Sequence, residues 1–235
     1  MFAMIQRATL RLVETAERAR AAGEVATVPP GMNIAGVDAA TEAVRADYGR
    51  TSRWLLGLLG TAGDAAAGLA AIFAGFGLSV APTDPATAAL SGAVGVVIAL
   101  ALALPSTLLL WRLHRSGRRL ARATAFWAAL PYLSGARRPV PGDYFAVRFL
   151  AYSPDLLIRV ISSVGAFLAA AFSLSMIFYA TAVDPDPTLA VIAVLWSVLF
   201  VAVTIGQFGG IQRIQVGYSH RDPLGYERRM RRART

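Results

Sequence analysis

One acidic residue of this sequence lies inside a long apolar stretch, where it could bind or carry a proton or a cation. Asp64 follows Trp54 by ten residues, a rise of about 15 Å in a helix, which predicts a depth near the middle of a bilayer. A carboxylate at that depth is costly unless it is protonated, paired or hydrated. Two interpretations stay open: a proton or cation site, or a protonated aspartate that donates one interhelical hydrogen bond, for example to Ser162, Ser163 or Ser173.

Small residues accompany Asp64 on one face of the same predicted helix. Spacings of three, four and seven residues bring Thr61 and four glycines onto this face, namely Gly57, Gly60, Gly68 and Gly75. Such a face lets another helix approach closely. We therefore expect it to be a helix-packing face, with Asp64 directed toward protein or an internal cavity and not toward lipid.

Arg159 is the second charge within a predicted membrane span. It lies only one turn inside the third span, so its long side chain can reach the interface, which explains it without a functional role. The alternative is that Arg159 is a charge partner of Asp64.

Enzyme chemistry is not indicated. The only histidines, His114 and His220, lie outside the apolar runs, and cysteine is absent, which excludes thiolate metal sites and disulfides. No nucleotide-binding loop or zinc-binding helix motif occurs. We predict a protein that is not an enzyme and that has no cofactor, no metal and no catalytic residue.

The elements that must position Asp64 follow from composition. Of the 235 residues, 56% are hydrophobic and only 16% are charged, whereas about a quarter of the residues of a soluble domain are charged. Four apolar runs are long enough to cross a bilayer, at about 54–80, 88–111, 156–182 and 189–208. The predicted fold class is all-α: a polytopic membrane protein with four transmembrane helices in two hairpins and cytoplasmic helical extensions.

The chain accordingly divides into five segments. A cytoplasmic helical segment, 1–53, precedes the first transmembrane hairpin, 54–112. An arginine-rich cytoplasmic loop follows over 113–155, and we interpret its apolar stretch at 124–133 as interfacial because it is too short to cross. The second hairpin covers 156–208, and a basic cytoplasmic tail covers 209–235.

Arginine sets the orientation. All 23 basic residues are Arg, with seven in the N-terminal segment, eight in the middle loop together with the adjoining Arg112, and seven in the tail, whereas the two short loops carry none. The positive-inside rule places all three segments, and both termini, in the cytoplasm. With the alanine- and glycine-rich composition, this favours a bacterial inner-membrane protein. We expect its partners to be the bilayer and other membrane subunits, and not nucleic acid; contacts with anionic lipid headgroups are assigned to Arg115, Arg118, Arg119 and Arg122.

Two motifs in the first hairpin resemble those of a known family. Gly57-Leu58-Leu59-Gly60-Thr61 opens the first span, and Ala103-Leu104-Pro105 ends the second, with Arg112-Leu113 following. The hairpin resembles the MotA/TolQ/ExbB family of proton-channel subunits. The resemblance implies an oligomer around a partner's helices, proton flow that drives work across the envelope, and Thr61 as a pore-lining hydroxyl. The family's second pore threonine has no counterpart here, and the third and fourth spans are additional.

Three hypotheses for function remain. The leading one is a non-enzymatic subunit of an oligomeric inner-membrane assembly, either a homo-oligomer or a complex with other membrane subunits, that conducts protons or cations along the Asp64 and Thr61 face. The second is a membrane scaffold or assembly factor that binds lipid or a partner through its cytoplasmic arginine surface. The third is a small secondary transporter of two repeated hairpins, because a shift of 102 residues pairs Asp84-Pro85 with Asp186-Pro187.

Overall fold

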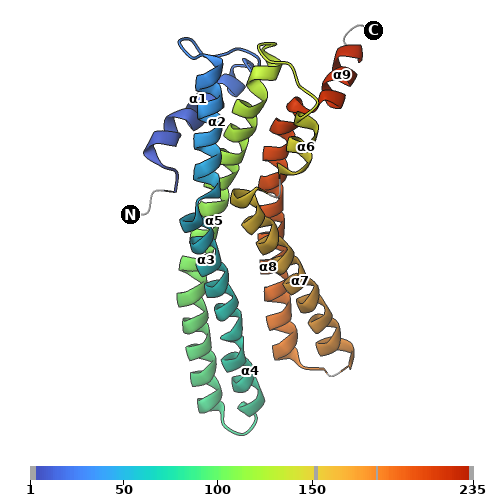
Figure 1. The fold of residues 1–235 in the computed structure, drawn as a ribbon. Coiled ribbons are helices and arrows are strands. Elements are labelled where there is room, and N and C mark those ends of the chain that lie inside the picture. Colours follow the sequence, from blue (N-terminus) through green and yellow to red (C-terminus); the bar gives the residue numbers. More distant parts are fainter. Residues whose placement is uncertain (1–3, 151–152, 184, 233–235) are drawn as a thin grey trace. The chain divides into compact units, whose positions relative to one another are not determined.

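All the regular secondary structure of the described residues is helical. The computed structural model describes residues 4–150, 153–183 and 185–232 (Figure 1). The α-helices are α1 (Arg7–Ala21), α2 (Ile34–Gly49), α3 (Thr51–Leu69), α4 (Ala71–Val80), α5 (Pro85–Leu133), α6 (Asp143–Arg148), α7 (Pro154–Phe178), α8 (Pro187–Tyr218) and α9 (Pro223–Arg232). A π-helical turn, Tyr179–Val183, extends α7, and a 3₁₀ turn, Ser219–Arg221, follows α8. The predicted all-α class is confirmed.

The chain forms two compact units. The first, which we name the arginine-rich unit, comprises Met1–Arg53, His114–Val160 and Gln207–Thr235. The second, which we name the apolar unit, comprises Trp54–Leu113 and Ile161–Gly206. The long helices α5, α7 and α8 contribute residues to both units, and each unit is described separately below.

The arginine-rich unit has an apolar core of the kind found in soluble proteins. Helices α1 and α2 lie beside the C-terminal half of α5 (Figure 1). Fully buried side chains from five helices form the core, and they include Val13, Val37, Val44, Leu120, Trp127, Leu130, Leu156 and Ile214. The Trp127 indole also donates a hydrogen bond of 3.2 Å to the Leu12 carbonyl.

This core changes the interpretation of the stretch 124–133. The sequence predicted an interfacial segment within a loop, but the stretch is the last part of helix α5 and is largely buried. Thr124 and Trp127 are fully covered, and Tyr132 is 7% exposed. Apolar side chains of α1 and α2, among them Val13 and Val37, pack against this part of α5. The aromatic residues therefore anchor a protein core within this unit.

Helix α8 approaches α5 very closely within the arginine-rich unit. A Cβ added at Gly217 would collide with the backbone of Ala125. Backbone atoms cannot move aside as the end of a flexible side chain can, so only glycine permits this helix crossing.

The apolar unit shows the opposite distribution of residues. Its buried side chains are mostly small, such as Ala67, Ala166, Ala170, Ala193, Ser163, Ser173 and Ser197. Large apolar side chains are exposed, including Leu59, Val97, Phe167, Val198 and Ile205, which are 60–67% exposed. Small residues inside and large apolar residues outside are typical of helices that pack closely within lipid.

Three helices among the described residues are long and apolar enough to cross a membrane. They are Pro85–Leu133, Leu156–Val183 and Pro187–Arg221. Two of them begin after an aspartate that caps the first turn: Asp84 accepts the Thr87 amide at 3.1 Å, and Asp186 accepts the Thr188 amide at 2.8 Å. The chain is thus compatible with a multi-pass membrane protein.

The first predicted span is divided into α3 and α4 at Ala70. The Ala70 amide is shared between the carbonyls of Ala66 and Ala67, at 3.3 and 3.1 Å. Its φ and ψ of −62° and −17° remain in the right-handed helical region. The division is therefore a local tightening of the helix, and residues 54–80 continue in one general direction.

Candidate functional site

The Asp64 carboxylate accepts a hydrogen bond from helix α5. The Thr107 hydroxyl lies 3.1 and 3.3 Å from its two oxygens. Asp64 is half-buried, while Thr107 is exposed on the surface of the apolar unit. The partner is therefore not one of the serines considered from the sequence: Ser162 accepts the Trp54 indole at 2.7 Å, and Ser173 donates to the Ala169 carbonyl at 2.8 Å.

The partner also gives a second measure of how far Asp64 lies from the charged parts of the helices. Thr107 precedes Arg112 by five residues, about 7.5 Å along α5, compared with about 15 Å counted from Trp54 to Asp64. The start of α3 lies beside a charged part of α5, where Arg53 donates to the Ser116 hydroxyl at 3.0 Å. The position of Asp64 near the middle of a bilayer stays a prediction.

The glycines on the Asp64 helix meet two different helices. A Cβ added at Gly60 would lie 2.9 Å from the Leu110 side chain of α5, and one at Gly68 would lie 2.7 Å from the Trp196 indole nitrogen of α8. A Cβ at Gly75 would collide with Thr188 of α8, whereas one at Gly57 would meet nothing within 4 Å. Three of the four glycines thus stand at close helix contacts within the apolar unit.

The indole of Trp196 packs directly against Gly68, where a larger residue would collide with it. The same indole donates a hydrogen bond of 3.0 Å to the Ala65 carbonyl of α3. This bond holds α8 against the residue next to Asp64 and satisfies the polar edge of a large aromatic ring.

Two further hydroxyl groups lie close to Asp64 and Thr107 along their own helices. The Thr61 hydroxyl, one turn before Asp64 on α3, donates to the Gly57 carbonyl at 2.9 Å. Ser106, next to Thr107 on α5, is the nearest neighbour that a Cβ at Gly63 would meet. We name Thr61, Asp64, Ser106 and Thr107 the Asp64 patch, in which the bond between Asp64 and Thr107 joins α3 to α5. Thr107 and Ser106 were missed from the sequence, because only the register of α3 against α5 selects them.

Arg159 contacts Tyr48 within the arginine-rich unit. It donates a hydrogen bond of 2.6 Å to the Tyr48 carbonyl, and its guanidinium lies 4.6 Å from the centre of the Tyr48 ring. That carbonyl is in the last turn of α2, where helices lack internal donors. Desolvation by burial raises the pKa of the Tyr48 phenol. Arg159 thus connects α7 to the end of α2.

The arginines assigned to lipid headgroups divide into two groups. Arg115, Arg118 and Arg122 are exposed. Arg119 instead pairs with Glu17 of α1 through two hydrogen bonds of 2.8 Å. This pair connects α1 to α5 and lowers the pKa of the Glu17 carboxyl.

No group of three or more side chains able to hold a metal ion occurs among the described residues. No family model, curated protein or solved structure matches the chain. Its function must therefore be argued from the Asp64 patch and the two units.

Proposed function

We propose that this chain is a non-enzymatic subunit of an oligomeric inner-membrane assembly, and that the Asp64 patch is covered by a second copy. The observation that carries the proposal is the half-buried Asp64 carboxylate, hydrogen-bonded to an exposed Thr107 in a unit that exposes many large apolar side chains. A carboxylate that faces acyl chains is costly. A second polar patch placed against it supplies hydrogen-bond partners that lipid tails lack.

The proposal includes four crossings with the arginine-bearing segments in the cytoplasm. One crossing, residues 54–80, is divided into α3 and α4. It can still span the bilayer, because the turn at Ala70 stays helical and 27 residues rise about 40 Å. The arginine counts of the three long segments, against none in the short loops, support the orientation. Cysteine labelling of the loops around Asp84 and Asp186 from outside the cell tests this layout, and protection of both loops would contradict it.

Proton or cation movement along the Asp64 patch is the second candidate function. The observation that favours it is the Thr107 hydroxyl bonded to the Asp64 carboxylate, since hydroxyls and carboxylates can pass protons or coordinate hard cations. In such a path Asp64 would be the carboxylate that binds the proton or cation, and Thr61 and Thr107 would be the neighbouring hydroxyls.

Self-association and flux separate the two functions. The purified protein is reconstituted, and its dissociation constant and its proton and cation fluxes are measured for the wild type, for Asp64→Asn and for the double variant Asp64→Leu with Thr107→Val. The double variant should weaken self-association by about three- to thirty-fold, the range expected for a polar contact between membrane helices. Glu42→Gln removes an equal charge from an exposed site and should change nothing.

Each outcome has a defined meaning. Unchanged self-association of the double variant would contradict the assembly role. Flux that is present in the wild type and lost in Asp64→Asn, with assembly intact, would establish conduction. Equal flux in both proteins would remove conduction and leave the assembly role in place.

A further inference from the structure

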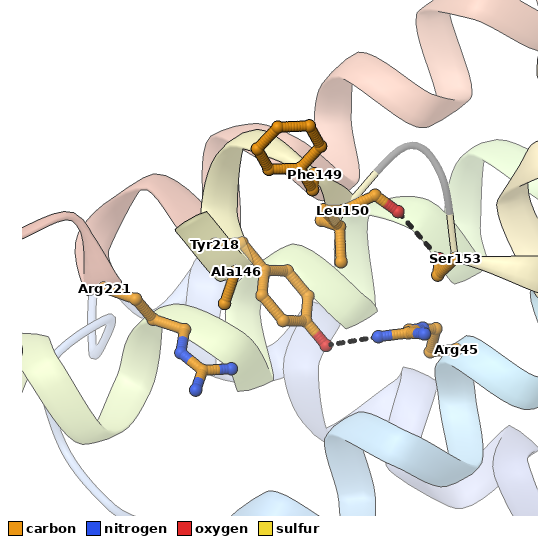
Figure 2. Close-up of a pocket in the computed structure, with 7 residues that line it drawn as sticks. All are labelled: Arg45, Ala146, Phe149, Leu150, Ser153, Tyr218 and Arg221. Atoms are coloured by element: carbon orange, nitrogen blue, oxygen red, sulfur yellow. Dashed lines mark hydrogen bonds between the residues drawn. The ribbon is translucent and has the colours of Figure 1, made fainter. Parts of the chain in front are cut away.

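A pocket of about 450 Å³ in the arginine-rich unit combines positive charge with an apolar wall (Figure 2). Its lining residues come from α2, from α6 and the segment after it, and from the end of α8: Arg45, Ala146, Phe149, Leu150, Ser153, Tyr218 and Arg221. The volume lies within the range of small-molecule sites. None of these residues was singled out from the sequence.

The polar end of the pocket is built around Tyr218. Two guanidinium groups lie on either side of its ring in Figure 2, with that of Arg45 at 6.0 Å and that of Arg221 at 5.7 Å from the ring centre. Arg45 also reaches the Tyr218 hydroxyl at 3.5 Å. Two guanidiniums and a phenol make a donor set suited to phosphate oxygens, while the Ser153 hydroxyl donates to the Leu150 carbonyl at 2.7 Å.

Arg221 is held in place and keeps an unused donor. One of its terminal nitrogens bonds to the Asp143 carboxylate at 3.1 Å, and the same carboxylate accepts the Val140 amide at 3.1 Å. The Arg221 Nε is buried and has no acceptor. A buried N–H donor without an acceptor is unfavourable, so Asp143 alone does not satisfy the Arg221 guanidinium.

The other end of the pocket is apolar and continues onto an exposed aromatic surface. Phe149 is 59% exposed and stacks on Phe145, which is 63% exposed, with 6.4 Å between ring centres. Leu150 and Ala146 complete the apolar wall. Exposed aromatic rings beside guanidinium groups are typical of protein surfaces at the headgroup level of a membrane.

We propose that this pocket binds the phosphate of an anionic phospholipid, with the headgroup between Arg45 and Arg221 and the start of an acyl chain against Phe149. A soluble phosphate compound can also bind the guanidinium groups, but it has no acyl chain to contact the apolar wall. Ser153 directly precedes α7, a helix long and apolar enough to cross a membrane, so a lipid at that helix end is within reach of the pocket.

Native mass spectrometry of the full chain in detergent tests the site. Phosphatidylglycerol, phosphatidylcholine and inorganic phosphate are titrated into the wild type, the double variant Arg45→Gln with Arg221→Gln, and the control Arg138→Gln. Arg138 is exposed, belongs to the same unit and does not line the pocket. The double variant should bind phosphatidylglycerol about tenfold more weakly, because it loses charge-assisted hydrogen bonds. The control should stay within about twofold of the wild type, since a remote surface charge adds little.

Two further measurements keep the proposal falsifiable. Arg45→Lys keeps the charge and should retain most of the affinity, and equal thermal midpoints show that the variants fold. Equal loss of phosphatidylglycerol binding in Arg138→Gln, or no loss in the double variant, would overturn the site. Inorganic phosphate that binds as tightly as phosphatidylglycerol would assign the pocket to a soluble phosphate compound and overturn the lipid.

Discussion

The two units of this chain bury opposite kinds of residue. The arginine-rich unit covers Trp127, Leu120 and Ile214 completely, as a soluble domain would. The apolar unit buries alanine and serine and exposes residues such as Phe167 and Val198. In water the hydrophobic effect drives large side chains inward, but lipid gives no such drive, so close packing of small residues decides what is buried. This difference is the one expected when water surrounds the arginine-rich unit and lipid surrounds the apolar unit.

The largest expected effect comes from truncating an aromatic side chain in each unit. Trp127→Ala should destabilise the protein by about 3–5 kcal/mol, because it leaves a cavity and also removes the bond to Leu12. Phe167→Ala removes a side chain that is 60% exposed and should cost less than about 1 kcal/mol. Chemical unfolding in micelles measures both. Similar losses would contradict the contrast between the units.

An acidic residue introduced on the surface of each unit gives the second comparison. Val97 is 65% exposed in the apolar unit, and Val140 is 56% exposed in the arginine-rich unit. Val97→Asp should impair membrane insertion of its helix by about 2.5–3.5 kcal/mol, the cost of an aspartate at a helix centre. Val140→Asp should have almost no effect, because its side chain stays in water. A glycosylation-based insertion assay reads the first change, and full insertion of Val97→Asp would show that this surface is not in lipid.

Glycine substitutions give a smaller effect and identify which helix contacts are rigid. Gly217→Ala forces a Cβ into the Ala125 backbone and should cost about 1–3 kcal/mol, as overpacking usually does. Gly57→Ala meets nothing within 4 Å and should be neutral or slightly stabilising through its higher helix propensity. Thermal midpoints of the two variants in the same detergent check this, and the reverse order would refute the close approach of α8 to α5.

The smallest expected effect concerns the ion pair between Glu17 and Arg119. Both side chains are more than one-third exposed, so Glu17→Gln should cost about 0.5 kcal/mol at neutral pH. Arg119 holds the pKa of Glu17 below its ordinary value of 4.5. The pair therefore stabilises the fold above that value, and this contribution disappears as the pH falls through the folded-state pKa.

Thermal midpoints measured against pH give the readout for this pair. The difference between the wild type and Glu17→Gln should be constant from neutral pH to about 5 and should shrink toward zero as the pH falls through the lowered pKa of Glu17. Glu42→Gln, which removes an exposed carboxylate of the same unit, is the matched control. A difference that persists at low pH would show that the effect of Glu17 is not electrostatic.

Local signals in the sequence were sufficient for much of the fold. The Asp-Pro steps at Asp84 and Asp186 mark helix starts, and both carboxylates cap the following turn. The stretch around Trp127 was misjudged because its short apolar run suits an interface as well as a core, and only packing of α1 and α2 decides between them. No residue signals the break at Ala70.

The candidate site was predictable only in part. Asp64 is conspicuous because an acidic residue in an apolar run is rare. Its partner Thr107 is not conspicuous, because it lies 43 positions further along the chain and only the register of α3 against α5 brings the two together. Arg45 and Arg221 of the pocket resemble every other arginine of the sequence, and only the fold brings both to the Tyr218 ring.

The most direct test of the proposed assembly uses the absence of cysteine from this chain. Leu104 is 59% exposed and lies one turn before Thr107 on α5, whereas Phe167 on α7 is 60% exposed. Single cysteines at the two positions, Leu104→Cys and Phe167→Cys, are oxidised in native membranes, and disulfide-linked dimers are quantified. Preferential crosslinking at Leu104, reduced when Asp64 is replaced by Leu, is the result we predict. Equal crosslinking at both positions, or none at Leu104, would contradict a second copy on the Asp64 patch.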